Sequence, residues 1–341
     1  MRRICTIAAH SWRALTLGTL FFASLAVASV RAEHSAEEPK TSLPLEANRT
    51  DDSVIVTAGG APFATYLFHS GHQPVIWPIH GPDGKAMTRQ YPFGEKLASE
   101  KDDHPHHRSL WFNHGSVNGL DFWMEPKAGA EGPQIVQRTI VVKDDVADDA
   151  SICLVTTNDW TNAGKKVCED ERKVCFSANA EGRWIDFAVT VKASDGELLF
   201  GDTKEGSFGI RVPGEFDVDA KRGGQIRNSR GQLDGDAWGR AADWVDYHGT
   251  INGKPAGIVV FDMPDSFRHP TRWHVRTYGL FAANPFGNSD FPAGDPPQGE
   301  VRLAKGEELK LHYRVLFYSG ERTAEQIGAI YREITAKPTD P

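Results

Sequence analysis

Short runs rich in Val, Ile, Thr, Phe and Tyr recur along this chain from Ser53 onward, separated by Gly, Asn, Asp and Pro. Many runs alternate apolar and polar residues, which is typical of half-buried antiparallel strands. With 33 Gly and 20 Pro in 341 residues, this spacing predicts an all-β fold, a large antiparallel β-sandwich. The expected strands are Ser53–Thr57, Phe63–Phe68, Gln134–Val142, Ile152–Trp160, Lys173–Ala178, Trp184–Ala193, Phe208–Val212, Gly257–Phe261, His274–Ala282 and Leu309–Tyr318.

Two stretches also predict which side chains are buried. In Trp184–Ala193 the alternation assigns Ile185, Phe187, Val189 and Val191 to the core, and Trp184, Asp186, Ala188, Thr190 and Lys192 to the other face. The one predicted helix is Ala324–Thr335, capped by Thr323. Its apolar stripe is Ile327, Ile330, Tyr331 and Ile334. Two loops, Gly81–Asp103 and Pro285–Gln298, exceed what turns need, and we expect them to carry function.

The first 32 residues have the form of an export signal. Arg2 and Arg3 precede an apolar run from Ala14 to Val30, and Val30-Arg31-Ala32 resembles a cleavage site, although an uncleaved anchor is the alternative. We expect residues 33–52 to be a flexible linker, 53–335 one sandwich domain and 336–341 a tail. Residues 33–341 contain no apolar stretch near the roughly 18 residues that cross a bilayer. The expected location is therefore the periplasm or the cell exterior, with no membrane contact after cleavage.

The net charge limits the classes of ligand, and the cysteine count predicts the disulfide content. Removing the four Arg of the signal leaves 34 Lys and Arg against 46 Asp and Glu, a net charge of −12. An acidic surface argues against nucleic acid as a partner and is compatible with a small-molecule or oligosaccharide ligand. Cys153, Cys168 and Cys175 remain in the mature chain, so one disulfide and one free thiol are expected, with the pairing open.

A histidine cluster marks the strongest candidate site. His104, His106, His107 and His114 fall within eleven residues, beside Arg108 and Trp111. If Arg108–Asn113 is a strand, then His104, His106 and Arg108 face one cavity and His114 returns after the strand. Such a cluster serves either as general acid and base or as a metal site with His104, His106 and His114 as ligands. A solvated, His-rich loop end is the alternative.

Two further stretches supply complementary groups. Glu205 lies in Gly201–Arg211 beside Gly206, and its carboxylate is a candidate base. In a strand that begins near Arg272, the side chains of Arg272, His274, Arg276 and Tyr278 share a face, which suits a polar binding surface. The alternative for the first stretch is a charged hairpin turn, and the alternative for the second is a solvated sheet face. Eight Trp remain after the signal, and Trp111, Trp123 and Trp273 adjoin these stretches, which favours a sugar ligand only weakly.

Three separated motifs are similar to those of the bacterial family labelled methane oxygenase PmoA, over roughly residues 53–335. They are Asp103-His104-Pro105-His106-His107-Arg108, Gly201-Asp202-Thr203-Lys204-Glu205-Gly206, and His269-Pro270-Thr271 with Trp273-His274-Val275-Arg276 and Ala282-Ala283-Asn284-Pro285-Phe286-Gly287. The resemblance implies a role in carbohydrate catabolism. It does not imply methane oxidation, because the methane monooxygenase subunit of that name is a multi-span membrane protein. A more distant likeness to galactose mutarotase-like supersandwiches implies a sugar site in which histidines act as the acid and a Glu acts as the base.

The leading hypothesis is a secreted enzyme that acts on a sugar or an oxidised sugar derivative, as an epimerase, lyase or hydrolase. The alternatives are a metal-dependent enzyme or metal-binding protein, with a divalent metal as cofactor, and a non-catalytic carbohydrate-binding protein. We expect the three motifs to meet in one cleft. The predicted catalytic residues are His106, His107, Glu205 and His274, and the predicted substrate-binding residues are Arg108, Trp111, His114, Arg211, Arg276, Tyr278 and Asn284.

Overall fold

A computed structural model of the chain describes residues 42–127, 129–145, 151–295 and 297–336. All of them belong to one compact unit, residues 40–341. The expected export signal and the last five residues of the expected tail lie outside the described residues. None of the described helices is long and apolar enough to cross a membrane.

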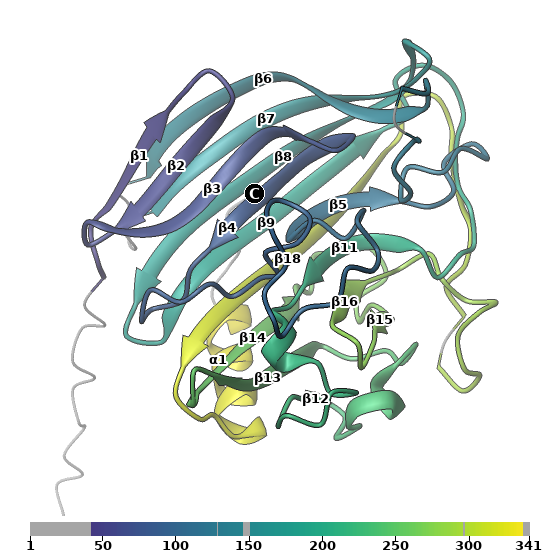
Figure 1. The fold of residues 1–341 in the computed structure, drawn as a ribbon. Helices are drawn as coiled ribbons and strands as arrows, with labels where there is room; N and C mark the ends of the chain where they lie inside the picture. Colours follow the sequence, from purple (N-terminus) through teal and green to yellow (C-terminus); the bar gives the residue numbers. More distant parts are fainter. Residues whose placement is uncertain (1–41, 128, 146–150, 296, 337–341) are drawn as a thin grey trace, which may run out of the picture. The chain divides into compact units, whose positions relative to one another are not determined.

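Two eight-stranded antiparallel sheets build this unit (Figure 1). Sheet A has the spatial order β1 (Leu45–Arg49), β2 (Ser53–Ala58), β3 (Ala61–Ser70), β4 (Gln73–Ile79), β5 (Leu110–His114), β11 (Gly206–Arg211), β16 (Leu280–Ala283) and β15 (Trp273–Val275). Sheet D has the order β12 (Gln225–Asn228), β13 (Trp244–Ile251), β14 (Lys254–Asp262), β18 (Glu308–Ser319), β9 (Gly182–Lys192), β8 (Lys165–Asn179), β7 (Ser151–Asn162) and β6 (Pro133–Asp145). The predicted all-β sandwich is confirmed.

Smaller elements complete the fold. They are a two-stranded sheet of β10 (Leu198–Phe200) and β17 (Val301–Leu303), two 3-10 turns, η1 (Gly214–Phe216) and η2 (Asp234–Ala237), and one helix, α1 (Ala324–Ala336). The main core lies between the sheets, because apolar side chains of both contribute to one buried cluster. Ile185, Phe187, Val189 and Val191 belong to it, as the alternation predicted.

Helix α1 covers part of the outer face of sheet D. Thr323 Oγ1 accepts a hydrogen bond from the backbone N–H of Gln326, while Gln326 Oε1 accepts one from the backbone N–H of Thr323. This reciprocal pair is a capping box, which explains where the helix begins. The predicted stripe is confirmed: Ile327 and Ile330 are buried against Trp184 and Phe261, and Tyr331 and Ile334 pack at the edge.

The structure corrects the predicted boundaries in two places. The linker expected over residues 33–52 contains a strand, since Leu45–Arg49 pairs with β2 along its whole length. Its Leu45 and Ala47 pack against the core, whereas Glu46 and Asn48 are exposed, so a two-residue alternation was present but short. The strand expected over His274–Ala282 is a hairpin, because the chain turns at Arg276–Gly279 between β15 and β16.

One disulfide crosses neighbouring strands of sheet D. Cys153 on β7 is bonded to Cys175 on β8, with their Cα atoms 4.0 Å apart, and Cys168 is a buried free thiol. The expectation of one disulfide and one thiol is confirmed.

Candidate active site

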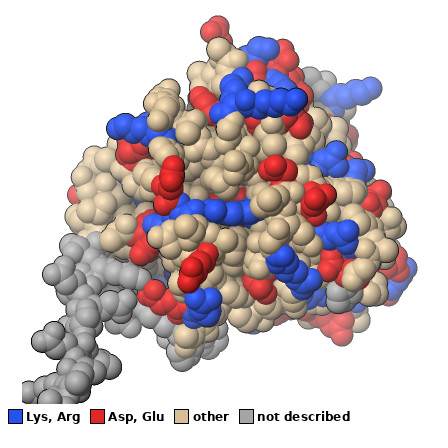
Figure 2. Space-filling model, turned by 90° about the horizontal axis from the view of Figure 1, so that it is seen from below, with Lys and Arg blue, Asp and Glu red and all other residues tan. Residues whose placement is uncertain are grey.

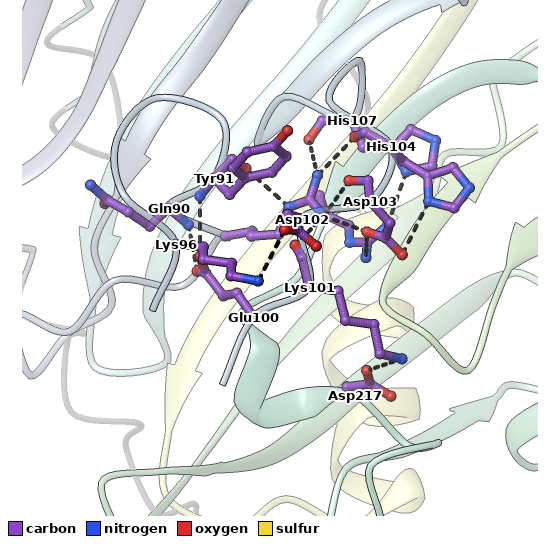
Figure 3. A network of polar contacts seen from close by, with 12 residues as sticks. Gln90, Tyr91, Lys96, Glu100, Lys101, Asp102, Asp103, His104, His107 and Asp217 are labelled. Atoms are coloured by element: carbon purple, nitrogen blue, oxygen red, sulfur yellow. Dashed lines mark hydrogen bonds and ion pairs between the residues drawn. The ribbon is translucent and has the colours of Figure 1, made fainter. Parts of the chain in front are cut away.

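The histidine-rich stretch forms a turn. The predicted alignment of His106 and Arg108 on one face depended on a strand, so it is not observed. His104 and Ser109 adopt positive φ angles of 44° and 55°, and β5 begins only at Leu110. Asp103 fixes this turn to sheet A: its Oδ1 accepts hydrogen bonds from Arg89 Nη1 and Arg211 Nη2, both at 2.8 Å (Figure 3). The guanidinium groups of Arg89 and Arg211 are almost fully buried, so this single carboxylate serves two buried cations.

The preceding loop is held by backbone hydrogen bonds. The Glu100 carboxylate accepts hydrogen bonds from the N–H groups of Gln90, Tyr91 and Leu97. Lys101 forms an ion pair with Asp217 at 2.8 Å, which ties the loop to the segment after η1 (Figure 3). The long loop Gly81–Asp103 is thus an ordered support for the histidine turn.

The rings of this turn pack on sheet A as one cluster. His107 lies with its ring centroid 5.5 Å from those of both Trp111 and Trp123, and 4.4 Å from that of His106. Burial, and then the charge of the neighbouring His104, lower the pKa of His106 to about 4. Burial, and then the charges of His106 and Arg211, likewise lower the pKa of His107. Both imidazoles are therefore neutral at pH 7.

Strand register places a second histidine on the same face of the sheet. Trp111 on β5 pairs with Gly209 on β11, Gly209 pairs with Ala282 on β16, and Ala282 pairs with His274 on β15. Because directly paired residues point to one side, all four face away from the sheet-D core. Three strand spacings separate Trp111 from His274, which is roughly 15 Å. The Gly209 position must be small, since a Cβ there would lie 2.5 Å from the Trp111 ring.

Partly exposed side chains connect the two ends of this row. Tyr278, in the β15–β16 turn, stacks on His104 with ring centroids 5.2 Å apart. The Arg276 guanidinium lies 5.7 Å from the Tyr278 ring centroid and 5.2 Å from that of Trp238. Trp238 Nε1 donates a 2.8 Å hydrogen bond to His274 Nδ1, so the neutral His274 imidazole carries its proton on Nε2. Burial and then the charges of Arg276 and Lys204 lower its pKa to about 3.

The Glu205 loop reaches the same region. Glu205 and Lys204 form an ion pair at 3.3 Å, and both side chains are partly exposed. The charge of Glu205 acts on Tyr278 and that of Lys204 acts on His274, so the pair lies near both residues. Asn284 positions the loop: its Nδ2 donates to the carbonyls of Thr203 and Lys204, and its Oδ1 accepts from two backbone N–H groups. Asn284 thus supports this loop, and its predicted contact with a substrate stays a prediction.

We call these residues the site face. It consists of His104, His107, Trp111, Glu205, Arg211, Trp238, His274, Arg276 and Tyr278. The three stretches singled out in the sequence, His104–His114, Gly201–Arg211 and Arg272–Tyr278, supply all but Trp238, and they meet on one face of sheet A.

Two N–H donors of the site face, and a third on the neighbouring Trp123, have no acceptor in the protein. Arg211 Nη1 donates to His107 Nδ1 at 3.1 Å, which places the His107 proton on Nε2. Among the described residues, His107 Nε2, Trp111 Nε1 and Trp123 Nε1 are buried without a hydrogen-bond partner. Buried N–H groups normally have an acceptor, so three in one cluster indicate a place suited to ligand or solvent oxygen atoms.

Two predicted site residues have structural roles. Arg108 is held by the Glu125 carboxylate through Nε and through Nη2, the latter at 3.0 Å. His114 is fully buried: its Nε2 lies 2.8 Å from the Gly201 carbonyl and its Nδ1 3.2 Å from Ser207 Oγ. Burial lowers its pKa to about 4.

The expected metal-ligand set is not assembled. His114 uses both ring nitrogens within the protein and packs against Phe200 and Phe286, away from the histidine turn. In the described part of the chain, no group of three or more His, Cys, Asp or Glu side chains is arranged to hold a metal ion. The prediction assumed a strand over Arg108–Asn113, whereas β5 begins at Leu110 and the residues before it form a turn.

Arg89 and Trp238 are neighbours of the candidate site that the sequence did not single out, and Asp103 stood in a quoted motif without a predicted role. Arg89 contacts Asp103 across fourteen residues, and Trp238 contacts His274 across thirty-six. No local pattern marks such pairs, because they depend on how distant loops fold onto the sheet. The only signal was the unusual length of the Gly81–Asp103 loop.

Cationic and anionic side chains are interspersed on the molecular face shown in Figure 2.

A groove of about 550 Å³, separate from the site face, lies on the outer face of sheet D. Arg138, Asp159, Lys166, Glu169, Lys192 and Glu308 line it, and they pair with one another.

Comparisons with known proteins give one family and several distant structures. The model of DUF6807, described as a family of unknown function, matches residues 53–332. No curated protein matches the sequence. A galactose mutarotase-like protein from Clostridium acetobutylicum is 10% identical, with a TM-score of 0.37, 82% of this chain covered and 99% of that one. Galactose 1-epimerase from Lactobacillus acidophilus is 10% identical, with a TM-score of 0.35, 82% of this chain covered and 100% of that one.

The heparan sulfate lyase HepC from Pedobacter heparinus is 9% identical, with a TM-score of 0.35 and 82% of this chain covered. The match covers 36% of the lyase, so this chain spans about a third of its length.

Proposed function

The chain belongs to the DUF6807 family, whose function is unknown, and we propose that it is a carbohydrate-active enzyme that works at the site face. One observation carries the proposal. A continuous series of contacts runs from His107 through His104, Tyr278, Arg276 and Trp238 to His274. It combines flat rings, neutral imidazoles and a cation on one sheet face.

This combination suits a sugar. Aromatic rings such as those of Tyr278 and Trp238 pack against the apolar face of a pyranose, and both side chains are partly exposed. Directional N–H donors are needed for hydroxyl oxygens, and His107 Nε2 and Trp111 Nε1 of the site face have no protein acceptor. Because Trp111 and His274 are roughly 15 Å apart, a ligand that reaches both ends of this row would be larger than one sugar ring.

The chemistry we propose is proton transfer. Glu205 is the base, because its carboxylate is partly exposed and lies near Tyr278. His107 and His274 are neutral at pH 7, and each carries its proton on Nε2. They would stabilise negative charge that develops on a substrate oxygen. Epimerisation, elimination and hydrolysis of a carbohydrate all include such a proton transfer.

A substrate screen tests this proposal. Residues 33–341 would be incubated with neutral sugars, sugar acids and keto sugars, and products detected by NMR. For any substrate found, Glu205→Gln should lower kcat at least about 100-fold, because it removes the base without changing side-chain size. The control is Glu308→Gln, an exposed residue of sheet D that pairs with Lys192.

Two outcomes would reject the proposal. Unchanged turnover in Glu205→Gln would exclude Glu205 as the base. Carbohydrate binding that survives replacement of both His107 and His274, with no product from any substrate, would favour a non-catalytic binding protein.

We also propose that the protein is exported to the periplasm or the cell exterior. The Cys153–Cys175 disulfide supports this, since disulfides persist mainly in oxidising compartments. Cell fractionation of the full chain would test it, and recovery only in the cytoplasm would contradict it.

A further inference from the structure

Arg276 differs from the arginines around it in having no carboxylate partner. Arg89 and Arg211 share Asp103, and Arg108 is held by Glu125. Among the described residues, no ion pair and no side-chain hydrogen bond involves the Arg276 guanidinium. Its contacts are with rings instead.

These ring contacts orient Arg276 for a ligand. The guanidinium lies 5.2 Å from the Trp238 ring centroid and 5.7 Å from that of Tyr278. Two neighbouring rings restrict a side chain that is otherwise flexible, so less entropy is lost on binding. The planar fork of N–H donors matches the two oxygens of a carboxylate.

The surrounding charges favour an anion. Arg89 and Arg211 bring two positive charges to the single negative charge of Asp103. Lys204 and Glu205 cancel each other, and the buried imidazoles of His107 and His274 are neutral. The negative charge of Glu100 also acts on Arg89, so the charges around Asp103 are balanced and Arg276 remains the unpaired positive charge of this region, although the whole chain has a net charge of −8. A positive charge on a protein of negative net charge attracts an anionic ligand to the place where the positive charge lies.

We propose that the ligand of the site face is a sugar acid whose carboxylate binds Arg276. The inference rests on the proposed carbohydrate function and narrows it to uronic or aldonic acids and chains that contain them. In this arrangement the sugar ring lies beside Tyr278 and Trp238, and its hydroxyl groups face the N–H donors of the sheet.

Paired titrations test the inference. Glucuronate, galacturonate, mannuronate and gluconate would each be compared with the neutral parent sugar by calorimetry, with acetate as a carboxylate without a sugar. The wild-type protein should bind at least one acid about tenfold or more tightly than its neutral parent. Arg276→Gln should remove that difference.

Two variants control for folding and for general charge. Arg276→Lys keeps the charge but not the fork, and it should recover only part of the preference. Arg302→Gln removes an exposed arginine of β17 that pairs with Glu197 and Glu300, and it should preserve the preference in full. Thermal unfolding of each variant shows whether it is folded.

The outcomes separate the inference from the function on which it rests. Equal affinity for acid and neutral sugar, or a preference that persists in folded Arg276→Gln, would overturn the sugar-acid inference while carbohydrate binding stands. Acetate that binds as tightly as the acids would overturn it too, because the sugar would then contribute nothing. No binding of any sugar, neutral or acidic, would overturn both.

Discussion

The outer face of sheet D and the site face of sheet A are both polar, yet their charges are arranged differently. In the groove of sheet D, Asp159 contacts both Arg138 and Lys166, and Lys192 contacts Glu308. Every charge named here has an opposite partner, and the cations keep much of their exposure to water. On the site face Arg276 has no such partner, and buried N–H donors have no acceptor.

The difference indicates which polar face binds a ligand. Paired, hydrated charges need nothing further, and they add little to stability. Unpaired donors supported by buried aromatic rings are costly to keep, so they indicate a function that uses them. The groove on sheet D is a well-formed hollow of about 550 Å³, but its size alone does not supply this chemistry.

The largest expected contrast in stability is between Asp103→Asn and Asp159→Asn. Losing Asp103 leaves the buried guanidiniums of Arg89 and Arg211 without a carboxylate, which we expect to destabilise the fold by about 2–3 kcal/mol. Losing Asp159 leaves cations that water can solvate, at a cost below about 1 kcal/mol. Urea unfolding of the two variants measures both values. Equal losses would show that the two faces do not differ in this way.

A smaller effect is expected from the hydrogen bond between Trp238 and His274. Trp238→Phe keeps a ring but removes the donor that holds the proton of His274 on Nε2. We expect kcat/KM to fall about tenfold. Nitrogen NMR shifts should show a mixture of His274 tautomers, which a merely structural role would not produce. Trp184→Phe, which removes an indole hydrogen bond to Asn179 at sheet D, is the control and should leave activity unchanged.

The smallest effect concerns His312 on sheet D, which lies between Asp186 and Asp265 at 2.9 Å from each. Burial opposes its protonation, but hydrogen bonding to Asp186 and the charges of Asp186 and Asp265 outweigh burial and raise its pKa. Burial would raise the pKa of Asp186, but the hydrogen bond and charge of His312, with Arg314, lower it.

A histidine whose pKa is raised on folding stabilises the fold at pH values below its pKa in the unfolded chain, about 6.5. This contribution is lost as the pH rises through the pKa of the folded state. A lowered aspartate pKa stabilises above about 3.9, and this is lost as the pH falls through the folded pKa. His312→Asn should therefore cost up to about 1 kcal/mol near pH 5.5 and less at pH 8.5. Chemical unfolding at both pH values checks this, with the exposed His69→Asn as control. An equal cost at both would contradict the ion pair.

Regular periodicity made much of the fold predictable, as in Trp184–Ala193, where nine consecutive alternating residues specify the buried face. The prediction was wrong where local signals were short or conditional. Leu45–Arg49 has only two inward-facing apolar residues, and His274–Ala282 conceals a turn because Arg276 and Tyr278 continue the alternation in sequence.

The site was predictable in its members more than in its geometry. Residue chemistry pointed to His107, Glu205, His274, Arg276 and Tyr278, which the structure brings to one face. Burial and partner choice decided the rest, because His114 and Arg108 differ from His107 and Arg276 only in what lies beside them in the fold. No local pattern encodes that difference.

The most direct test of the central claim is a crystal structure of residues 33–341 with a bound sugar acid. We expect the sugar beside Tyr278 and Trp238, with its carboxylate within hydrogen-bonding distance of the Arg276 guanidinium and a hydroxyl or ring oxygen near His274 or His107. A sugar bound instead in the groove between Arg138 and Lys192, with the site face unchanged, would contradict the account.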